Sequence, residues 1–213
     1  MAIVINGSGT VTGISVGGLP DGIVDDGTLA TDSVTAAKLK DDAIATGDLP
    51  AGSVLQTLSS TYTGQASGTG TAWGLPHADC SLTITPSSAT NKILITVNSY
   101  MSTDGNAWAG IALFKDGSAI AEAKNAETDS QIGTSGGTGY ITQSYNAHYP
   151  HVIQATPFSY YDTAGGTSAI VYQFRVRARA SGGFWGVNRT QDGSSDDANI
   201  APVSTITLME IKA

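Results

Sequence analysis

Residues 170–180, IVYQFRVRARA, show the clearest alternation of apolar and polar side chains in the chain. One set of alternate positions is apolar (Tyr172, Phe174, Val176, Ala178), and the other is polar (Gln173, Arg175, Arg177, Arg179). Successive side chains of a β-strand point to opposite faces, so this pattern predicts an antiparallel strand with one face buried.

Other stretches of the same half of the chain give similar signals. Residues 91–101, NKILITVNSYM, place Ile93, Ile95, Val97 and Met101 on one face. Residues 109–123, AGIALFKDGSAIAEA, read as two strands joined at Asp116-Gly117, a preferred hairpin pair. Further strands are expected at 54–62, 80–85, 140–145, 151–157 and 204–211. So many short strands predict a mostly β fold, with a β-sandwich, most simply a jelly roll, over residues 55–213.

Residues 13–57 follow a different pattern, in which every fifth residue is aliphatic. The nine positions are Ile14, Leu19, Val24, Leu29, Val34, Leu39, Ile44, Leu49 and Val54. Five is not the period of a helix, a strand or a coiled coil. One aliphatic side chain in five also gives too little apolar surface to offset the entropy of ordering the segment. The segment is therefore expected to need partners.

Two architectures have this period. One is a single-chain pentapeptide solenoid, whose small inward companion position holds glycine or alanine at most repeats but Asp32 and Asp42 at two of them. The other is a fibre in which three identical chains each contribute one aliphatic side chain per layer. We favour the fibre and expect residues 1–54 to form an extended stalk.

Composition excludes several classes of function. The net charge of −8 disfavours nucleic-acid binding, which needs clustered cations. Cys80 is the single cysteine, which rules out an internal disulfide and predicts a small buried side chain. The opening MAIVINGSG has an apolar run too short for a signal peptide, and no stretch has the length of a membrane span. We expect a protein made in a cytoplasm.

Groups that could carry chemistry are sparse in the sequence. His148 and His151 flank Pro150, and we expect packed or exposed histidines there rather than a metal site shared with His77. The loop TQDGSSDDAN offers oxygen ligands but lacks the spacing of a calcium-binding loop; they are Asp192, Ser194, Asp196 and Asp197. We predict no enzyme, no cofactor and no metal.

Two clusters are candidate ligand contacts. Arg175, Arg177 and Arg179 form a cationic stripe, which suits an anionic sugar or phosphate, although such a stripe is more often a solvated face or pairs with acids of a neighbouring subunit. In GGFWGVNR, Trp185 lies in a glycine-flanked setting with Asn188 and Arg189 close by. A tryptophan is more often a core aromatic than a sugar contact, and Trp185 is the single best candidate for an exposed contact with a sugar ring.

Two N-terminal stretches resemble a known family. DSVTAAKLKDDAI (32–44) resembles the short repeats of bacteriophage tail fibres, and INGSGTVTGISVGGLPDGIV (5–24) is similar to the leader of small virion-associated fibre proteins of phages. The resemblance implies a homotrimeric structural protein of the virion, attached to the phage tail through residues 1–54.

The rest of the chain resembles the C-terminal knob of phage fibres and related trimeric surface proteins. The similarity lies in PSSATNKILITVN (86–98), ALFKDGSAI (112–120), 159–178 and VSTITLMEIKA (203–213). It implies a tumour-necrosis-factor-like sandwich over 55–213, packed as three copies, which binds a host cell-surface glycan or protein. A head fibre or capsid-decorating trimer is the alternative location. The expected partners are two further copies, other virion proteins and the host surface, without nucleic acid or membrane insertion.

Overall fold

The computed structural model describes residues 44–103, 108–120, 140–143, 153–178, 181–191 and 202–213, with four single positions between 31 and 39. The chain divides into two compact units, Met1–Asp48 and Leu49–Ala213. In the first unit the regular element described is the 3-10 helix η2 (Thr46–Asp48), where the Ala45 N–H donates to Asp48 Oδ2 at 2.9 Å. The described residues include no helix with the length and hydropathy needed to cross a bilayer.

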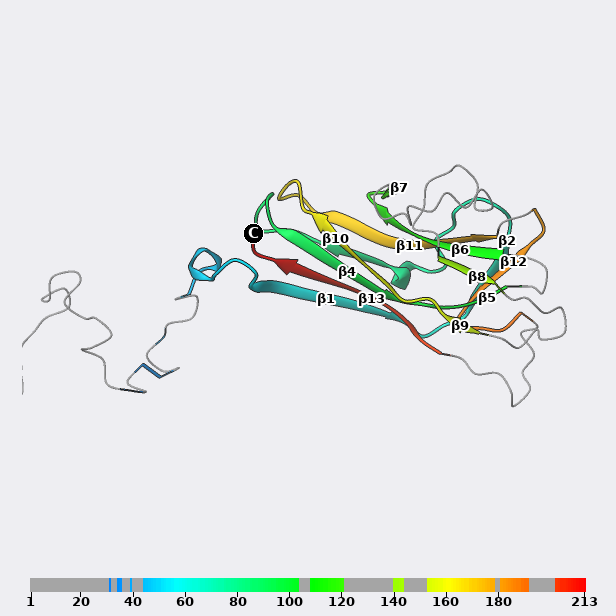
Figure 1. The fold of residues 1–213 in the computed structure, drawn as a ribbon, viewed down its shortest axis with the longest axis horizontal. Helices are drawn as coiled ribbons and strands as arrows, with labels where there is room; N and C mark the ends of the chain where they lie inside the picture. The colour runs from blue at the N-terminus through cyan, green and yellow to red at the C-terminus, as the bar shows by residue number, and fades with distance from the viewer. Residues whose placement is uncertain are drawn as a thin grey trace, which may run out of the picture. The chain divides into compact units, whose positions relative to one another are not determined.

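The second unit is built from antiparallel strands in three hydrogen-bonded sheets (Figure 1). The first sheet has the order β1-β13-β4-β10, with strands Val54–Tyr62, Ser204–Ile211, Lys92–Asn98 and Phe158–Thr163. The second has the order β3-β11-β6-β7, with strands Ser81–Ile84, Ile170–Ala178, Trp108–Lys115 and Ser118–Ala119, and β8 (Tyr140–Gln143) also pairs with β6. The third has the order β2-β12-β5-β9, with strands Ala66–Thr69, Phe184–Val187, Tyr100–Thr103 and Gln154–Ala155.

The third sheet repeats the strand order of the first because each of its strands neighbours one of those strands along the chain. Thus β1 leads to β2, β4 to β5, β9 to β10 and β12 to β13. The two sheets are halves of one layer, interrupted where its strands break. The antiparallel sheets and the core that they enclose are compatible with a β-sandwich.

The alternation that predicted the strands also builds the core. In β11 every second residue is buried, which confirms the predicted apolar face of this strand. Fully buried side chains from both layers meet in one cluster, among them Ile93, Ile95, Leu113, Phe174 and Leu208. The 3-10 helix η3 (Ala78–Cys80) leads into β3 and buries Cys80 completely, as predicted.

The hairpin between β6 and β7 turns at the predicted pair. Asp116 and Gly117 have φ of 49° and 81°, which suits the two central residues of a type I′ turn. The Asp116 side chain also accepts from the Val171 N–H at 2.9 Å and so fixes the turn to β11.

The predicted strands at 54–62 and 204–211 coincide with β1 and β13. The expected strand at 151–157 is only the short β9, and a longer strand, β10, starts one residue after Pro157. Proline lacks the N–H that a ladder needs, which explains the break. The strands β2 and β12 were not predicted, because they are short, contain glycine and lack a clear alternation.

Candidate functional site

The described aliphatic side chains of the period-five row are exposed within a single chain. Val34, Leu39 and Ile44 expose 52%, 46% and 58% of their surface, and Val54 exposes 52%. Leu49 is half-buried. The other predicted members of the row, Ile14, Leu19, Val24 and Leu29, lie outside the described residues. The described part of the row is therefore an apolar surface that the chain leaves open.

The row enters the β unit beside the C-terminus. Ser53 N–H donates to Pro50 O at 3.2 Å and closes a turn in which Gly52 takes the positive φ of 87°. Gly52 N–H then donates to Lys212 O at 2.8 Å, and Lys212 N–H donates to Ser53 O at 2.9 Å. The ammonium of Lys212 also donates to Leu49 O. Entry and C-terminus thus share one end of the unit, while β2, β5, β9 and β12 lie at the other (Figure 1).

Trp185 lies on β12 at the end remote from the C-terminus. It is partly buried and packs against the hydrophobic core. Its ring passes so close to Gly68 on β2 that a Cβ at Gly68 would lie 2.6 Å from Trp185 Cζ2. The glycine therefore makes room for the indole, and only part of the ring remains open to a ligand.

Asn188 is placed in the interior rather than on the surface. Its Nδ2 donates to Tyr62 O at 2.8 Å and Gly64 O at 3.0 Å, and its Oδ1 accepts from Ser204 Oγ at 2.6 Å. Asn188 is completely buried and has a φ of 57°. Its side chain hydrogen-bonds the end of β1 and the start of β13. Asn188 is thus not available to contact a ligand, contrary to the sequence-based assignment.

Asn188 belongs to a buried polar seam where the first and third sheets meet. Thr156 N–H donates to Ser99 O at 2.7 Å, and Asn188 N–H donates to Tyr100 O at 2.9 Å. The Ser204 hydroxyl also accepts from the Tyr100 N–H at 3.3 Å. These bonds satisfy backbone groups that the strand breaks would otherwise leave unpaired.

Arg189 remains partly exposed at the same end of the β unit. Its Nη1 donates to Ser67 Oγ at 3.1 Å and its Nε donates to Thr190 O at 3.1 Å. The guanidinium lies 5.8 Å from the centroid of the Phe184 ring. Of the three residues chosen in GGFWGVNR, Arg189 thus lies on the outer face of the third sheet with Phe184, whereas Trp185 packs against the core on the other face.

The arginine stripe on β11 is stacked on aromatic rings of its own chain. Arg175 lies 4.5 Å from the Phe114 ring and donates to Gln173 Oε1 at 2.7 and 3.1 Å. Arg177 lies 4.6 Å from the ring of Trp73, and burial lowers the pKa of its guanidinium. Arg179 lies outside the described residues. The two described arginines therefore cover an aromatic cluster on the outer face of the second sheet.

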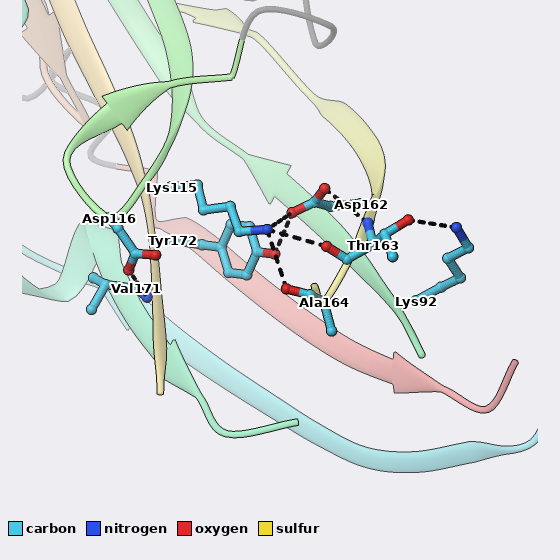
Figure 2. A network of polar contacts seen from close by, with 8 residues as sticks. All are labelled: Lys92, Lys115, Asp116, Asp162, Thr163, Ala164, Val171 and Tyr172. Atoms are coloured by element: carbon cyan, nitrogen blue, oxygen red, sulfur yellow. Dashed lines mark hydrogen bonds and ion pairs between the residues drawn. The ribbon is translucent and has the colours of Figure 1, made fainter. Parts of the chain in front are cut away.

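Two further polar clusters were missed by the sequence reading. In Figure 2, Lys115 on β6 reaches Asp162 on β10 at 2.8 Å, and the Tyr172 hydroxyl donates to the same oxygen, Asp162 Oδ2, at 2.6 Å. Burial and this hydrogen bond raise the pKa of Tyr172. Lys115 also donates to the Thr163 carbonyl at 3.1 Å. The cluster ties the two layers together at one edge.

The second cluster surrounds Glu210, which is fully buried. Its carboxylate accepts from Gln56 Nε2 (2.6 Å), Ser87 N (2.7 Å), Ser87 Oγ (2.8 Å) and Asn91 Nδ2 (2.6 Å). Burial opposes its ionisation, but these bonds outweigh burial and hold the pKa of Glu210 below its usual value. An acid at an inward position of the alternating strand β13 is the signal that could have revealed it.

The groups weighed for metal binding are not brought together in the described parts of the chain. His77 stacks on Tyr62 with ring centroids 4.8 Å apart, and its Nδ1 accepts from the Asp79 N–H at 3.2 Å. Among the described residues, His, Cys, Asp and Glu form no group of three suited to a metal ion. The other candidate ligands lie outside those residues: His148, His151, Asp192, Ser194, Asp196 and Asp197. Burial raises the pKa of Cys80 to about 12, which keeps its thiol protonated.

No family model matches the chain, and no curated protein matches it.

Proposed function

We propose that this protein is a short trimeric fibre of a bacteriophage virion. Residues 1–54 attach it to the tail and form the stalk, and residues 55–213 form a knob that binds a host-surface glycan or protein. The role is structural and adhesive, without a catalytic step. The proposal rests on one observation above all: four described members of the aliphatic row, Val34, Leu39, Ile44 and Val54, are exposed, and the row ends at the start of a compact β unit.

The exposed row supports a stalk made from several chains. Val34, Leu39 and Ile44 each leave about half of their surface open, although each buried aliphatic side chain contributes roughly 2 kcal/mol. Three copies wrapped around a shared axis would bury these side chains against one another. Their regular spacing would then give one apolar layer for every five residues.

The strand order supports a jelly-roll knob. When each broken strand is counted once and the two-residue β7 is left out, the described strands give the order β1-β13-β4-β10 in one layer and β3-β11-β6-β8 in the other, because β8 also pairs with β6. This is the order of two facing four-stranded sheets in a jelly roll. The tumour-necrosis-factor-like trimer remains part of the proposal.

The placement of the termini supports outward presentation of the distal end. A chain held through residues 1–48 enters the β unit beside Lys212, so the end that carries Trp185 and Arg189 lies away from the attachment point. Three knobs on one stalk also present three copies of any weak site, which raises the effective concentration at a host surface.

The test is competition for infection. Purified full-length protein should adsorb to susceptible bacteria and reduce phage adsorption in a dose-dependent manner. The variant Arg189→Ala should compete less well than Lys92→Ala, whose cation lies on the first sheet away from the distal end. A folded trimer that neither adsorbs nor competes would exclude the adhesive role.

A head fibre or capsid-decorating trimer is the second candidate, because the open aliphatic row would dock on a capsid equally well. Copy number separates the two locations. A tail fibre predicts a few trimers per particle, whereas decoration predicts many, and a reconstruction of the particle would count them.

A further inference from the structure

We infer that the outer face of the second sheet holds a binding site for an oxyanion, namely the carboxylate or phosphate group of an acidic envelope polysaccharide. This inference rests on the adhesive role proposed above, and it adds a site separate from Arg189 on the third sheet. We call this site the arginine face. Its described members are Trp73, Ser81, Thr83, Gln173, Arg175 and Arg177.

Burial and register place these polar side chains on one face of the sheet. In β11 buried and partly exposed residues alternate, and the partly exposed set includes Gln173, Arg175 and Arg177. Strand pairing aligns Gln173 with Ser81 of β3, and Gln173 Nε2 donates to Ser81 Oγ at 3.2 Å. Thr83, two residues further along β3, is exposed on the same side. The polar side chains of the two strands therefore form one surface.

Aromatic rings hold the two guanidinium groups in place. Arg177 pairs with Gly110 of β6, where a Cβ would lie 3.2 Å from Trp73 Cη2, so the glycine lets the indole approach the sheet. Arg177 lies 4.6 Å from the centroid of this indole, and Arg175 lies 4.5 Å from that of Phe114. Because the stacking orders these long side chains before a ligand arrives, binding costs less conformational entropy.

The arginine face has more hydrogen-bond donors than acceptors. Arg175 Nε and Nη2 donate to Gln173 Oε1 at 3.1 and 2.7 Å, and Nη1 has no acceptor in the described part of the chain. Trp73 Nε1 is buried and also has no acceptor among the described residues. A guanidinium has five N–H groups and accepts no hydrogen bond, so a carboxylate or a phosphate is its complement.

The charge of the arginine face is opposite to that of the chain. The whole chain carries −8, whereas the described members of the face include two cations and no carboxylate. Neither of the ion pairs that join described residues includes Arg175. Burial lowers the pKa of Arg177 because it weakens the solvation of the cation, and a nearby anion would offset that loss.

The net charge also selects among the ligands that carry oxyanions. A dense polyanion such as duplex DNA, with one charge per about 1.7 Å, would be repelled by a chain of net charge −8. An acidic polysaccharide instead carries separate charges among neutral hydroxyl groups. Ser81, Thr83 and Gln173 share the face with the arginines and can exchange hydrogen bonds with such hydroxyls.

The experiment is a calorimetric titration of the full-length protein with two acidic probes and one neutral probe. The probes are the trisaccharide of galacturonic acid, glucose 6-phosphate and maltotriose. Arg175→Gln removes one cation but keeps a long side chain over Phe114, and Arg175→Lys keeps the charge without the planar fork. Lys92→Gln is the matched control, because it removes a cation from the first sheet. Circular dichroism checks that each variant folds.

We expect an acidic probe to bind the parent protein and Lys92→Gln equally, and to bind Arg175→Gln about tenfold or more weakly. Arg175→Lys should lie between them, and salt should weaken binding to the parent. Tighter binding of the galacturonate assigns a carboxylate as the ligand group, and tighter binding of glucose 6-phosphate assigns a phosphate. Either result supports the inference.

Maltotriose that binds as tightly as the acidic probes would overturn the inference, as would folded Arg175→Gln with the affinity of the parent protein. If the parent adsorbs to susceptible bacteria but binds neither acidic probe, the inference is wrong and the fibre proposal stands. A folded parent protein that shows neither adsorption nor binding would overturn the adhesive role and the inference together.

Discussion

The carboxylate of Glu210 is fully buried, and the four hydrogen-bond donors around it come from uncharged groups. Replacing it with glutamine keeps the size and shape of the side chain but removes the charge. One oxygen becomes an NH2 group and so becomes a donor in a site built from donors. We predict that Glu210→Gln strongly destabilises the protein at neutral pH.

The magnitude follows from the four hydrogen bonds. The new amide would face Gln56 Nε2, now 2.6 Å from Glu210 Oε2, and Gln56 cannot flip without losing its bond to Thr85 O at 2.9 Å. Losing that charge-assisted bond costs about 1.5–3 kcal/mol, and the bonds from Ser87 and Asn91 each weaken by about 1 kcal/mol. The neutral glutamine avoids the cost of burying a charged carboxylate, and this offsets part of the loss. We therefore expect the free energy of unfolding to fall by about 2–4 kcal/mol.

Thermal unfolding at pH 7 measures the effect. For a unit of this size the loss corresponds to a decrease in Tm of about 5–12 °C. Asp79→Asn is the control, because it neutralises a carboxylate whose side chain is half-exposed, and we expect a change of less than about 1 kcal/mol.

The pH dependence gives an independent check. The pKa of Glu210 is lower in the folded than in the unfolded protein, so its stabilisation is present above the unfolded value of about 4.3 and is lost as pH falls through the folded pKa. The gap in stability between the parent protein and Glu210→Gln should therefore narrow in acid. A variant as stable as the parent at pH 7, or a gap that widens as pH falls, would refute this account of the network.

Three further predictions concern the interior. Asn188→Ala removes three hydrogen bonds and places alanine at a positive φ. We expect the free energy of unfolding, measured in urea, to fall by about 3–4 kcal/mol. The control Asn98→Ala changes an exposed side chain and should lower it by less than about 1 kcal/mol. Gly68→Ala should displace the Trp185 indole and shift tryptophan fluorescence; an unchanged spectrum and stability would contradict the close approach. Cys80 should resist thiol reagents at pH 8 until the protein unfolds, because burial raises its pKa to about 12; rapid labelling of the native protein would disprove that burial.

The sequence predicted the β unit well where burial alternates along a strand. The inward positions of β11 and the turn at Asp116-Gly117 follow from local rules, and the structure has both. The burial of Cys80 was predicted from its residue type, as the single cysteine of the chain, and the structure also has it. These features need only short-range information, namely the strand period and turn chemistry.

The side-chain environments at the candidate site were much less predictable. Asn188 was chosen as a ligand contact because it lies close to the glycine-flanked Trp185, but its side chain bonds to Tyr62, which lies 126 positions away in the sequence. The arginines of β11 were candidates for an anionic ligand, with a solvated face or pairing with acids of a neighbouring subunit as the alternatives. In the structure Arg177 stacks on Trp73, a residue from a distant segment. Contacts of this kind depend on which strands become neighbours, and no periodicity within one strand encodes that choice.

The antiparallel pairing of β1 with β13 also decides how the β unit would carry a mechanical load. A pull on Leu49 against a hold at the distal end acts along β1, which is bonded to β13 from Val54 to Tyr62. The hydrogen bonds of the pair are then loaded together in shear rather than opened one after another. The chain enters the β unit at Gly52, beside Lys212 near the C-terminus. This arrangement suits a β unit that must stay folded under tension while its distal end is held.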